Sequence, residues 1–145
     1  LFHVDNSFYQ NSFVLNEKAA KASLEPGDHG TTYGGNPFVC AAVSKVFDLY
    51  EKEQIVDHVK KVGGYLEQKL NALVEKYDFL KERRGKGLIQ GLEVEGRPIG
   101  EIVNRGLEEG LIIITAGSNV LRFVPPLVVT EADVDEMITK LEKCF

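Results

Sequence analysis

Residues 27–37 combine four glycines, two adjacent threonines and a signal for the start of a helix, a combination suited to binding an anion. Glycine lets the backbone adopt positive φ and bring amide hydrogens close to an oxyanion, while the hydroxyls of Thr31 and Thr32 can donate to phosphate or carboxylate oxygens. Asn36 is predicted as the N-cap and Pro37 as the first residue of the following helix. A plain surface turn uses the same residue types, so composition alone leaves both interpretations open.

A second candidate is Arg122, an isolated cation in the middle of an apolar run. In an extended strand its guanidinium would point to the face opposite Leu121 and Phe123. A guanidinium can bind a carboxylate through two parallel hydrogen bonds, which would suit an amino acid, a keto acid or a buried glutamate. The alternative is an arginine that simply faces solvent.

The other reactive side chains form no recognisable arrangement. His29 lies in the glycine loop and is interpreted as a loop-shaping residue, whereas His3 and His58 have no companion metal ligands at a suitable spacing. Cys40 and Cys144 have neither CxxC nor His/Cys spacing, so we expect free thiols instead of a disulfide or a zinc site. We therefore predict no catalytic residue and no metal ligand within this chain.

Length and charge restrict the class of protein further. A chain of 145 residues with 43% hydrophobic content is expected to form one ordinary globular core. The formal net charge of −5 comes from interspersed charges, which argues against a nucleic-acid surface or a polybasic membrane anchor. No signal peptide or membrane span is recognised, so a cytoplasmic location is the default expectation. The chain begins at Leu1 and has its one methionine at position 137, which favours a processed form or a piece of a longer protein.

Apolar periodicity predicts an α/β sandwich in which helices cover one face of a short sheet. Residues 17–22 are good helix formers, and residues 81–86 are interpreted as a short basic turn. Helices are predicted at residues 36–52, 55–77, 98–109 and from residue 131 onward, with Thr130 and Asp133 as a capping box and Gly110 as a left-handed cap. Strands are predicted at residues 13–15, 88–94, 111–114 and 120–124.

Two packing details follow from the same patterns. The first long helix is expected to bury one face, which carries Phe38, Ala41, Ala42, Val46 and Leu49. The second long helix contains Gly63 and Gly64, where we expect another backbone to pack closely.

The glycine loop, the helix after it and the Arg-x-x-Pro-Pro-Leu segment at residues 122–127 together resemble the C-terminal part of class-III, ornithine-type pyridoxal-phosphate aminotransferases. The resemblance runs from about residue 13 to residue 145. It implies the α/β small C-terminal domain of a fold-type I aminotransferase, with a short, mostly antiparallel sheet covered by helices. It also favours the anion loop over the plain turn.

The resemblance assigns roles to three residues of this sequence. It implies that Thr32 binds the phosphate of pyridoxal 5'-phosphate held by the neighbouring subunit, and that Thr31 approaches the substrate in the same site. Arg122 would meet either a carboxylate of the amino acid or an active-site glutamate. Each active site would then be shared across a homodimer that takes a small amino acid and a 2-oxo acid.

For the intact parent, the resemblance implies transfer of the terminal amino group of N-acetylornithine to 2-oxoglutarate, within arginine biosynthesis. Ornithine, succinylornithine and 4-aminobutyrate are alternative amino donors. An unrelated nucleotide-binding module is a weaker alternative, because no lysine followed by serine or threonine comes after the glycines, as a P-loop requires.

The resemblance also divides the chain and reveals a departure from the family pattern. Residues 1–12 resemble a segment near the family's N-terminus, residues 13–36 the end of the large domain with its phosphate loop, and residues 37–145 the small domain. The family's Schiff-base lysine and large cofactor domain have no counterpart in these residues. We therefore expect this chain alone to lack turnover and to act at most as a non-catalytic folded or dimerisation module.

Overall fold

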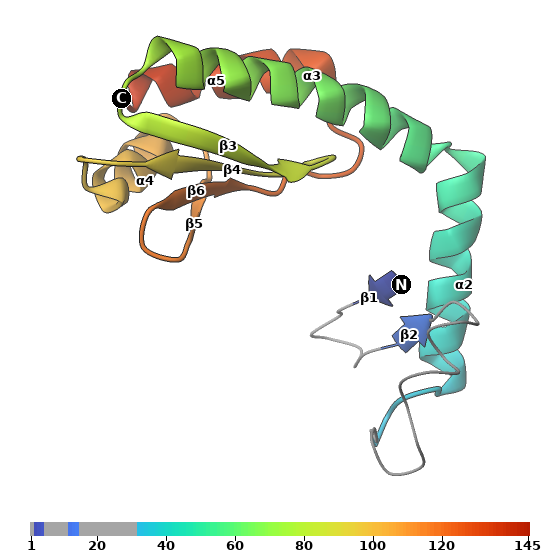
Figure 1. Cartoon of the computed structure of the whole chain (residues 1–145). Coiled ribbons are helices and arrows are strands. Elements are labelled where there is room, and N and C mark those ends of the chain that lie inside the picture. The colour runs from blue at the N-terminus through green and yellow to red at the C-terminus, as the bar shows by residue number, and fades with distance from the viewer. Residues whose placement is uncertain (1, 5–11, 15–31) are drawn as a thin grey trace. The chain divides into compact units, whose positions relative to one another are not determined.

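The computed structural model describes residues 2–4, 12–14 and 32–145, in two compact units, Leu1–Glu53 and Gln54–Phe145 (Figure 1). In the first unit, strand β1 (Phe2–Val4) pairs antiparallel with β2 (Ser12–Val14), and helix α2 spans Pro37–Lys52. The strand predicted at residues 13–15 overlaps β2. The helix-forming residues 17–22 and His29 lie outside the described residues.

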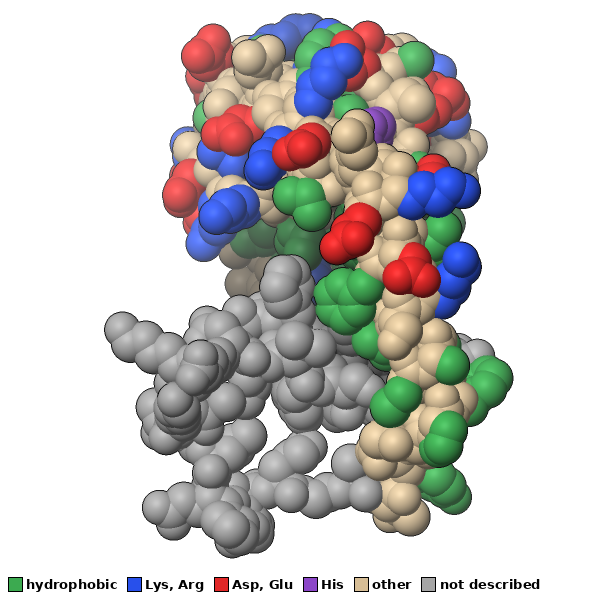
Figure 2. Space-filling view, turned by 90° about the vertical axis from the view of Figure 1, so that its right-hand side faces the viewer, with side chains coloured by type: hydrophobic (Ala, Val, Ile, Leu, Met, Phe, Trp, Pro, Cys, Tyr) green, Lys and Arg blue, Asp and Glu red, His purple; other side chains and the backbone are tan. Residues whose placement is uncertain are grey.

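Helix α2 begins where the sequence predicts. Asn36 is the N-cap and its side-chain oxygen accepts a hydrogen bond from the Val39 amide at 3.1 Å, while Pro37 is the first helical residue. The prediction of a buried face on this helix is wrong, because Phe38 is 68% exposed and Val46 is 44% exposed. Figure 2 shows hydrophobic side chains on the surface along α2. The apolar core cluster of the described residues belongs to the second unit, and Val39 is the one residue of α2 that is buried.

The second unit is an α/β domain with an antiparallel sheet of order β3-β4-β6-β5. Its elements, in chain order, are α3 (Ile55–Lys76), β3 (Leu80–Lys86), β4 (Ile89–Val94), α4 (Ile99–Glu108), β5 (Ile114–Ala116), β6 (Val120–Phe123) and α5 (Glu131–Lys143). Gly110 has a left-handed backbone, with φ of +72°, just after α4, as predicted. The predicted fold class, a short antiparallel sheet with helices packed against it, is confirmed.

Two local predictions in this unit are wrong. Residues 81–86 form no turn but most of β3, because antiparallel pairing with β4 extends a segment that shows no strand pattern in the sequence. Residues 111–114 do not form a buried strand, since β5 begins only at Ile114, where pairing with β6 begins. Ile113 is buried, yet Ile112 is 82% exposed. A β-branched run therefore needs a partner strand before it becomes part of a sheet.

The core lies between the three helices of this unit and one face of the sheet. Its fully buried leucines come from two helices and two strands: Leu66 and Leu70 of α3, Leu92 of β4, Leu121 of β6 and Leu141 of α5. Ile102 of α4 belongs to the same cluster. The opposite face of the sheet has no helix of this unit packed on it, and that open face carries the candidate site.

Helices α3 and α5 run in the same direction along a row of polar contacts. Three ion pairs connect them in rising order of residue number: Lys61 with Glu131 at 3.3 Å, Lys69 with Asp135 at 2.7 Å and Lys76 with Glu142 at 2.7 Å. The Asp135 carboxylate also accepts a hydrogen bond from the Tyr65 hydroxyl at 2.8 Å. The Lys69 ammonium and, next, the Tyr65 hydroxyl hold the pKa of the Asp135 carboxyl below its ordinary value.

Helix α3 touches the turn between β3 and β4 backbone to backbone. A Cβ atom placed on Gly63 would lie 2.8 Å from the carbonyl carbon of Gly87, so only glycine fits at position 63. A Cβ atom placed on Gly64 would meet no atom within 4 Å. The predicted close approach of another backbone is thus confirmed at Gly63 and wrong at Gly64.

These two neighbouring glycines form a matched pair of sites for alanine substitution. We expect Gly63→Ala to lower the free energy of unfolding by about 1–3 kcal/mol, because the new methyl group collides with the Gly87 backbone. Gly64→Ala should instead raise it by roughly 0.5–1 kcal/mol, because alanine favours the helix and the space is open. Urea unfolding followed by circular dichroism measures both changes. Equal effects of the two substitutions would contradict the close contact.

The contact of Asp135 with Lys69 should make the domain acid-sensitive. Folding lowers the pKa of Asp135, so the ionised carboxylate stabilises the folded state. This stabilisation is complete above the ordinary aspartate pKa of about 4 and is lost as the pH falls through the pKa of Asp135 in the folded protein. We expect Asp135→Asn to flatten the fall of the thermal midpoint between about pH 5 and pH 2. Asp78→Asn is the control, since the Asp78 side chain makes no ion pair with any described residue. An unchanged pH profile in Asp135→Asn would count against this contribution.

Candidate functional site

Arg122 lies in the middle of β6, and the alternation of that strand sends its side chain to the open face of the sheet. Leu121 and Phe123 are buried in the core with exposures of 0% and 4%, whereas Arg122 is exposed. The predicted orientation of Arg122 is therefore confirmed. Two neighbouring strands hydrogen-bond to β6, so the backbone that carries Arg122 is held on both sides.

The direct cross-strand neighbours of Arg122 on the open face are apolar. Its cross-strand neighbours are Gly91 on β4 and Ile114 on β5, and Ile114 is 46% exposed. Arg122 makes no hydrogen bond or ion pair with any described residue. A cation with apolar cross-strand neighbours and no protein partner can bind an anion through both arms of its guanidinium.

A second arginine of the same face has a protein partner already. Arg84 on β3 is the other cross-strand neighbour of Gly91, and its guanidinium forms an ion pair with Glu93. The second oxygen of the Glu93 carboxylate accepts a hydrogen bond from the Asn119 side-chain amide at 3.0 Å. Of the two arginines beside Gly91, Arg122 is thus the one whose charge is not compensated locally.

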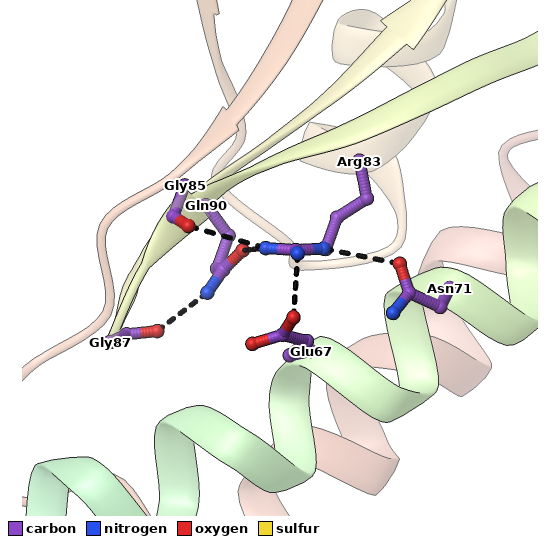
Figure 3. A network of polar contacts seen from close by, with 6 residues as sticks. All are labelled: Glu67, Asn71, Arg83, Gly85, Gly87 and Gln90. Atoms are coloured by element: carbon purple, nitrogen blue, oxygen red, sulfur yellow. Dashed lines mark hydrogen bonds and ion pairs between the residues drawn. The ribbon is translucent and has the colours of Figure 1, made fainter.

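Arg83, one residue earlier, lies on the covered face and its hydrogen-bonding capacity is nearly used up (Figure 3). Its three nitrogens donate to the following acceptors: Asn71 Oδ1 at 3.1 Å, Gly85 O at 3.3 Å, Gln90 Oε1 at 2.9 Å and Glu67 Oε1 at 2.6 Å. Gln90 is 1% exposed and donates in turn to the Gly87 carbonyl at 2.7 Å. This network joins α3 to the β3–β4 hairpin and leaves Arg83 at most one free N–H donor for a ligand.

Sequence reasoning missed the Arg83 network and the ion pair of Arg84 with Glu93. One signal was available, because Gln90 is a polar residue within an apolar strand and a buried amide needs partners. The identity of those partners depends on the register of β3 against β4, and residues 81–86 show no alternation from which a strand could be recognised.

Thr32 lies in the turn that leads into α2, and it is exposed. The Asn36 side-chain amide donates to the Tyr33 carbonyl at 2.6 Å and closes this turn, in which Gly35 has φ of +71°. A Cβ atom on Gly35 would meet no atom within 4 Å, so this side of the turn is open. Thr31 lies outside the described residues. Thr32 belongs to the first unit and Arg122 to the second.

The turn has the chemistry required to bind a phosphate ester. It presents the Thr32 hydroxyl and a glycine-containing backbone directly before the N-terminus of α2, where the helix dipole favours negative charge. It carries no acidic side chain between residues 32 and 38 that would repel an anion. The residues present therefore fit one wall of a phosphate site.

Other candidate sites are weak or absent in the described part of the chain. No group of three or more potential metal-ligating side chains occurs there, and none of its helices is long and apolar enough to cross a membrane. Cys40 is exposed and Cys144 is buried, both as free thiols, and burial raises the pKa of the Cys144 thiol, which disfavours the reactive thiolate. A shallow pocket beside α4 contains Arg97 and Arg105, whose guanidinium groups donate to backbone carbonyls at residues 145 and 144.

Comparison with known proteins identifies the family. Residues 6–145 match the family described as class-III aminotransferase, so this chain belongs to the class-III aminotransferases. An acetylornithine aminotransferase from Gloeobacter violaceus is 44% identical over 133 residues, which are 91% of this chain and 33% of the relative. The acetylornithine aminotransferase of Caldanaerobacter subterraneus is 46% identical over 125 residues, 86% of this chain and 32% of the relative.

Solved structures show the same likeness. An acetylornithine aminotransferase from Elizabethkingia anophelis superposes with a TM-score of 0.74 at 30% identity and covers 83% of this chain and 31% of its own. An ornithine aminotransferase from Toxoplasma gondii ME49 gives 0.74 at 31% identity, over 83% of this chain and 30% of its own. The chain spans about a third of the length of the curated relatives it matches.

The different surroundings of Arg83 and Arg122 predict opposite results of truncation. Arg83→Ala should lower the free energy of unfolding by about 2–3 kcal/mol, because the buried Gln90 amide oxygen loses its partner. Arg122→Ala should change it by less than about 0.5 kcal/mol, as for an exposed side chain without a partner. Chemical denaturation of both variants provides the test. A large loss of stability in Arg122→Ala would indicate a structural role for this residue.

Proposed function

We propose that the intact protein carrying this chain is a pyridoxal-phosphate-dependent aminotransferase that transfers the terminal amino group of N-acetylornithine to 2-oxoglutarate. The observation that carries the proposal is Arg122, an exposed guanidinium without a described protein partner, between apolar cross-strand neighbours on the open face of the sheet. The choice of amino donor is supported by relatives that are 44% and 46% identical and are named acetylornithine aminotransferase.

Arg122 is the residue we assign to substrate binding. The donor and the acceptor of this reaction each carry a carboxylate, and a planar guanidinium binds a carboxylate with two parallel hydrogen bonds. The backbone of Arg122 is held by β4 on one side and β5 on the other, so only its side chain needs ordering when the ligand binds.

Thr32 is the residue we assign to the cofactor. Its hydroxyl would donate a hydrogen bond to the cofactor phosphate, and the turn backbone and the start of α2 would complete that side of the phosphate site. Bound pyridoxal phosphate supplies the electron-withdrawing ring on which an amino group is exchanged. In our proposal Thr32 contributes binding and orientation only, while Thr31 approaches the substrate.

A second candidate activity is ornithine aminotransferase. The ornithine aminotransferase of Toxoplasma gondii superposes with the same TM-score, 0.74, as the acetylornithine enzyme of Elizabethkingia anophelis. The two donors differ in the amino group next to the carboxylate, which is free in ornithine and acetylated in acetylornithine. We favour acetylornithine because the curated relatives at 44% and 46% identity carry that name.

The proposal extends to assembly and location. We infer a homodimer in which the loop of residue 32 of one subunit serves the cofactor of the other, and a cytoplasmic enzyme of arginine biosynthesis. The domain division proposed from the sequence, with boundaries after residues 12 and 36, is part of the same inference. The exposed apolar side chains of α2 are compatible with burial against further protein.

Substitutions at both sites in the intact protein test the proposal. Arg122→Gln should raise the half-saturating concentration of acetylornithine about 10- to 100-fold, because a charge-assisted bidentate contact is lost. Thr32→Val should weaken binding of pyridoxal phosphate about tenfold, and Thr32→Ser should restore it, because serine keeps the hydroxyl. Initial rates and fluorescence titration of the cofactor are the measurements.

The control is Arg97→Gln, which removes an arginine that stacks on Phe79 away from the open face. This substitution should leave both the half-saturating concentration of acetylornithine and the affinity for pyridoxal phosphate unchanged. Full cofactor affinity in Thr32→Val together with unchanged kinetics in Arg122→Gln would overturn the assignment of both residues. Absence of any amino transfer from acetylornithine by the intact protein would overturn the activity itself.

A further inference from the structure

The segment that joins β6 to α5, residues 124–129, contains only one backbone hydrogen bond of its own. Pro125 and Pro126 lack amide hydrogens, so they cannot donate to neighbouring backbone. The apolar side chains of this segment extend outward, with exposures of 51% for Val124, 39% for Leu127 and 68% for Val128. The segment starts one residue after Phe123, the buried end of the strand that carries Arg122.

One side chain from a distant element holds the far end of this segment. His58 Nε2 donates a hydrogen bond to the Val129 carbonyl at 2.9 Å, and His58 is the only described residue whose side chain bonds to the backbone of residues 124–129. The Val129 amide donates to the Pro126 carbonyl at 3.1 Å and closes a turn. Thr130 and Asp133 then begin α5 with a reciprocal capping box.

The backbone of His58 is held within helix α3. His58 belongs to the first turns of α3 and is half-buried, and its amide donates to the Gln54 carbonyl at 3.0 Å. Val59, the next residue, lies against the β3–β4 turn, 3.3 Å from the position that a Cβ atom on Gly87 would take. Figure 1 shows the connection from β6 to α5 passing near this turn, close to α3.

The position of residues 124–129 matters for Arg122. Val124 follows Arg122 by two residues and lies just past the end of β6, and because Pro125 favours extended backbone before it, we expect the Val124 side chain on the same open face. Val124 would then border the guanidinium, and its place depends on a segment with few hydrogen bonds of its own. The ladder with β4 and β5 fixes the backbone of Arg122, but it does not reach the turn at Val129.

We propose that His58 is a positioning residue, which holds residues 124–129 through Val129 and so keeps an apolar wall beside the carboxylate ligand of Arg122. The inference rests on the proposed function for its ligand, and on the described contacts for its mechanism. His58 touches neither ligand nor cofactor in this arrangement. Its imidazole adds one hydrogen bond to a segment in which two consecutive prolines offer no amide donor.

The competing explanation is a general contribution to the contact of α3 with α5. Lys61 provides the matched control, because it lies one turn further along α3 and pairs with Glu131 at 3.3 Å, just past the same turn. Both contacts begin at the start of α3, but that of Lys61 reaches α5 at Glu131, whereas that of His58 reaches Val129 in the segment before α5. A merely structural role would make the two substitutions equivalent.

The experiment uses the intact protein and three variants, His58→Ala, His58→Gln and Lys61→Gln. The first readout is amide hydrogen exchange at Val129, whose amide donates to the Pro126 carbonyl, compared with Leu66 in the core. We expect His58→Ala to speed exchange in the segment about tenfold with Leu66 unchanged, and His58→Gln to restore it within about twofold, because glutamine keeps a donor. Lys61→Gln should leave the segment as it is.

The second readout is steady-state kinetics with acetylornithine. His58→Ala should raise KM about fivefold with kcat within about twofold, His58→Gln should recover most of this, and Lys61→Gln should have no effect. Unchanged exchange in His58→Ala, or equal effects of Lys61→Gln, would overturn the positioning role while the proposed activity stands. A protein without aminotransferase activity would overturn the proposed function and the ligand, and the exchange data would still decide whether His58 holds the segment.

Discussion

The register of β4 against β6 decides what each face of the sheet presents. Leu92 lies opposite Leu121 on the covered face, and Gly91 lies opposite Arg122 on the open face. A slip of one residue would send Arg122 into the core and a leucine to the open face, and the burial of both leucines at 0% exposure prevents it. The three helices bury the leucine face of the sheet, and this register therefore places Arg122 on the open face.

The arginines of this sheet differ in whether they have a protein partner. Arg83 and Arg84 are adjacent in sequence, yet one points toward α3 and the other toward Glu93 on the open face. Both are paired with carboxylates, and Arg83 donates in addition to a buried amide and an asparagine. Arg122 differs from them in having no described partner, so it is their surroundings, and not the residue type, that distinguish the three.

Much of the fold could be predicted from the sequence where the signal is local. Asn36 and Thr130 cap their helices as expected, and the alternation around Arg122 gave its face correctly, because each depends on residues within one turn or one strand. The secondary structure was predicted wrongly where it depends on pairing with another strand, as in β3 and at residues 111–114. The hydrogen bond of His58 to Val129 spans 71 positions, and nothing in the local pattern of either residue indicates it. The roles of Thr32 and Arg122 came from resemblance to a family, since their spacing alone allowed several ligands.

The meeting of Gly63 with Gly87 has a mechanical consequence. Where side chains separate two elements, a small displacement of one is absorbed by rotation about χ angles in the other. Here the two main chains touch directly, with no rotatable group between them. The tip of the β3–β4 hairpin and helix α3 should therefore move together, so a displacement of the hairpin tip shifts α3 as well.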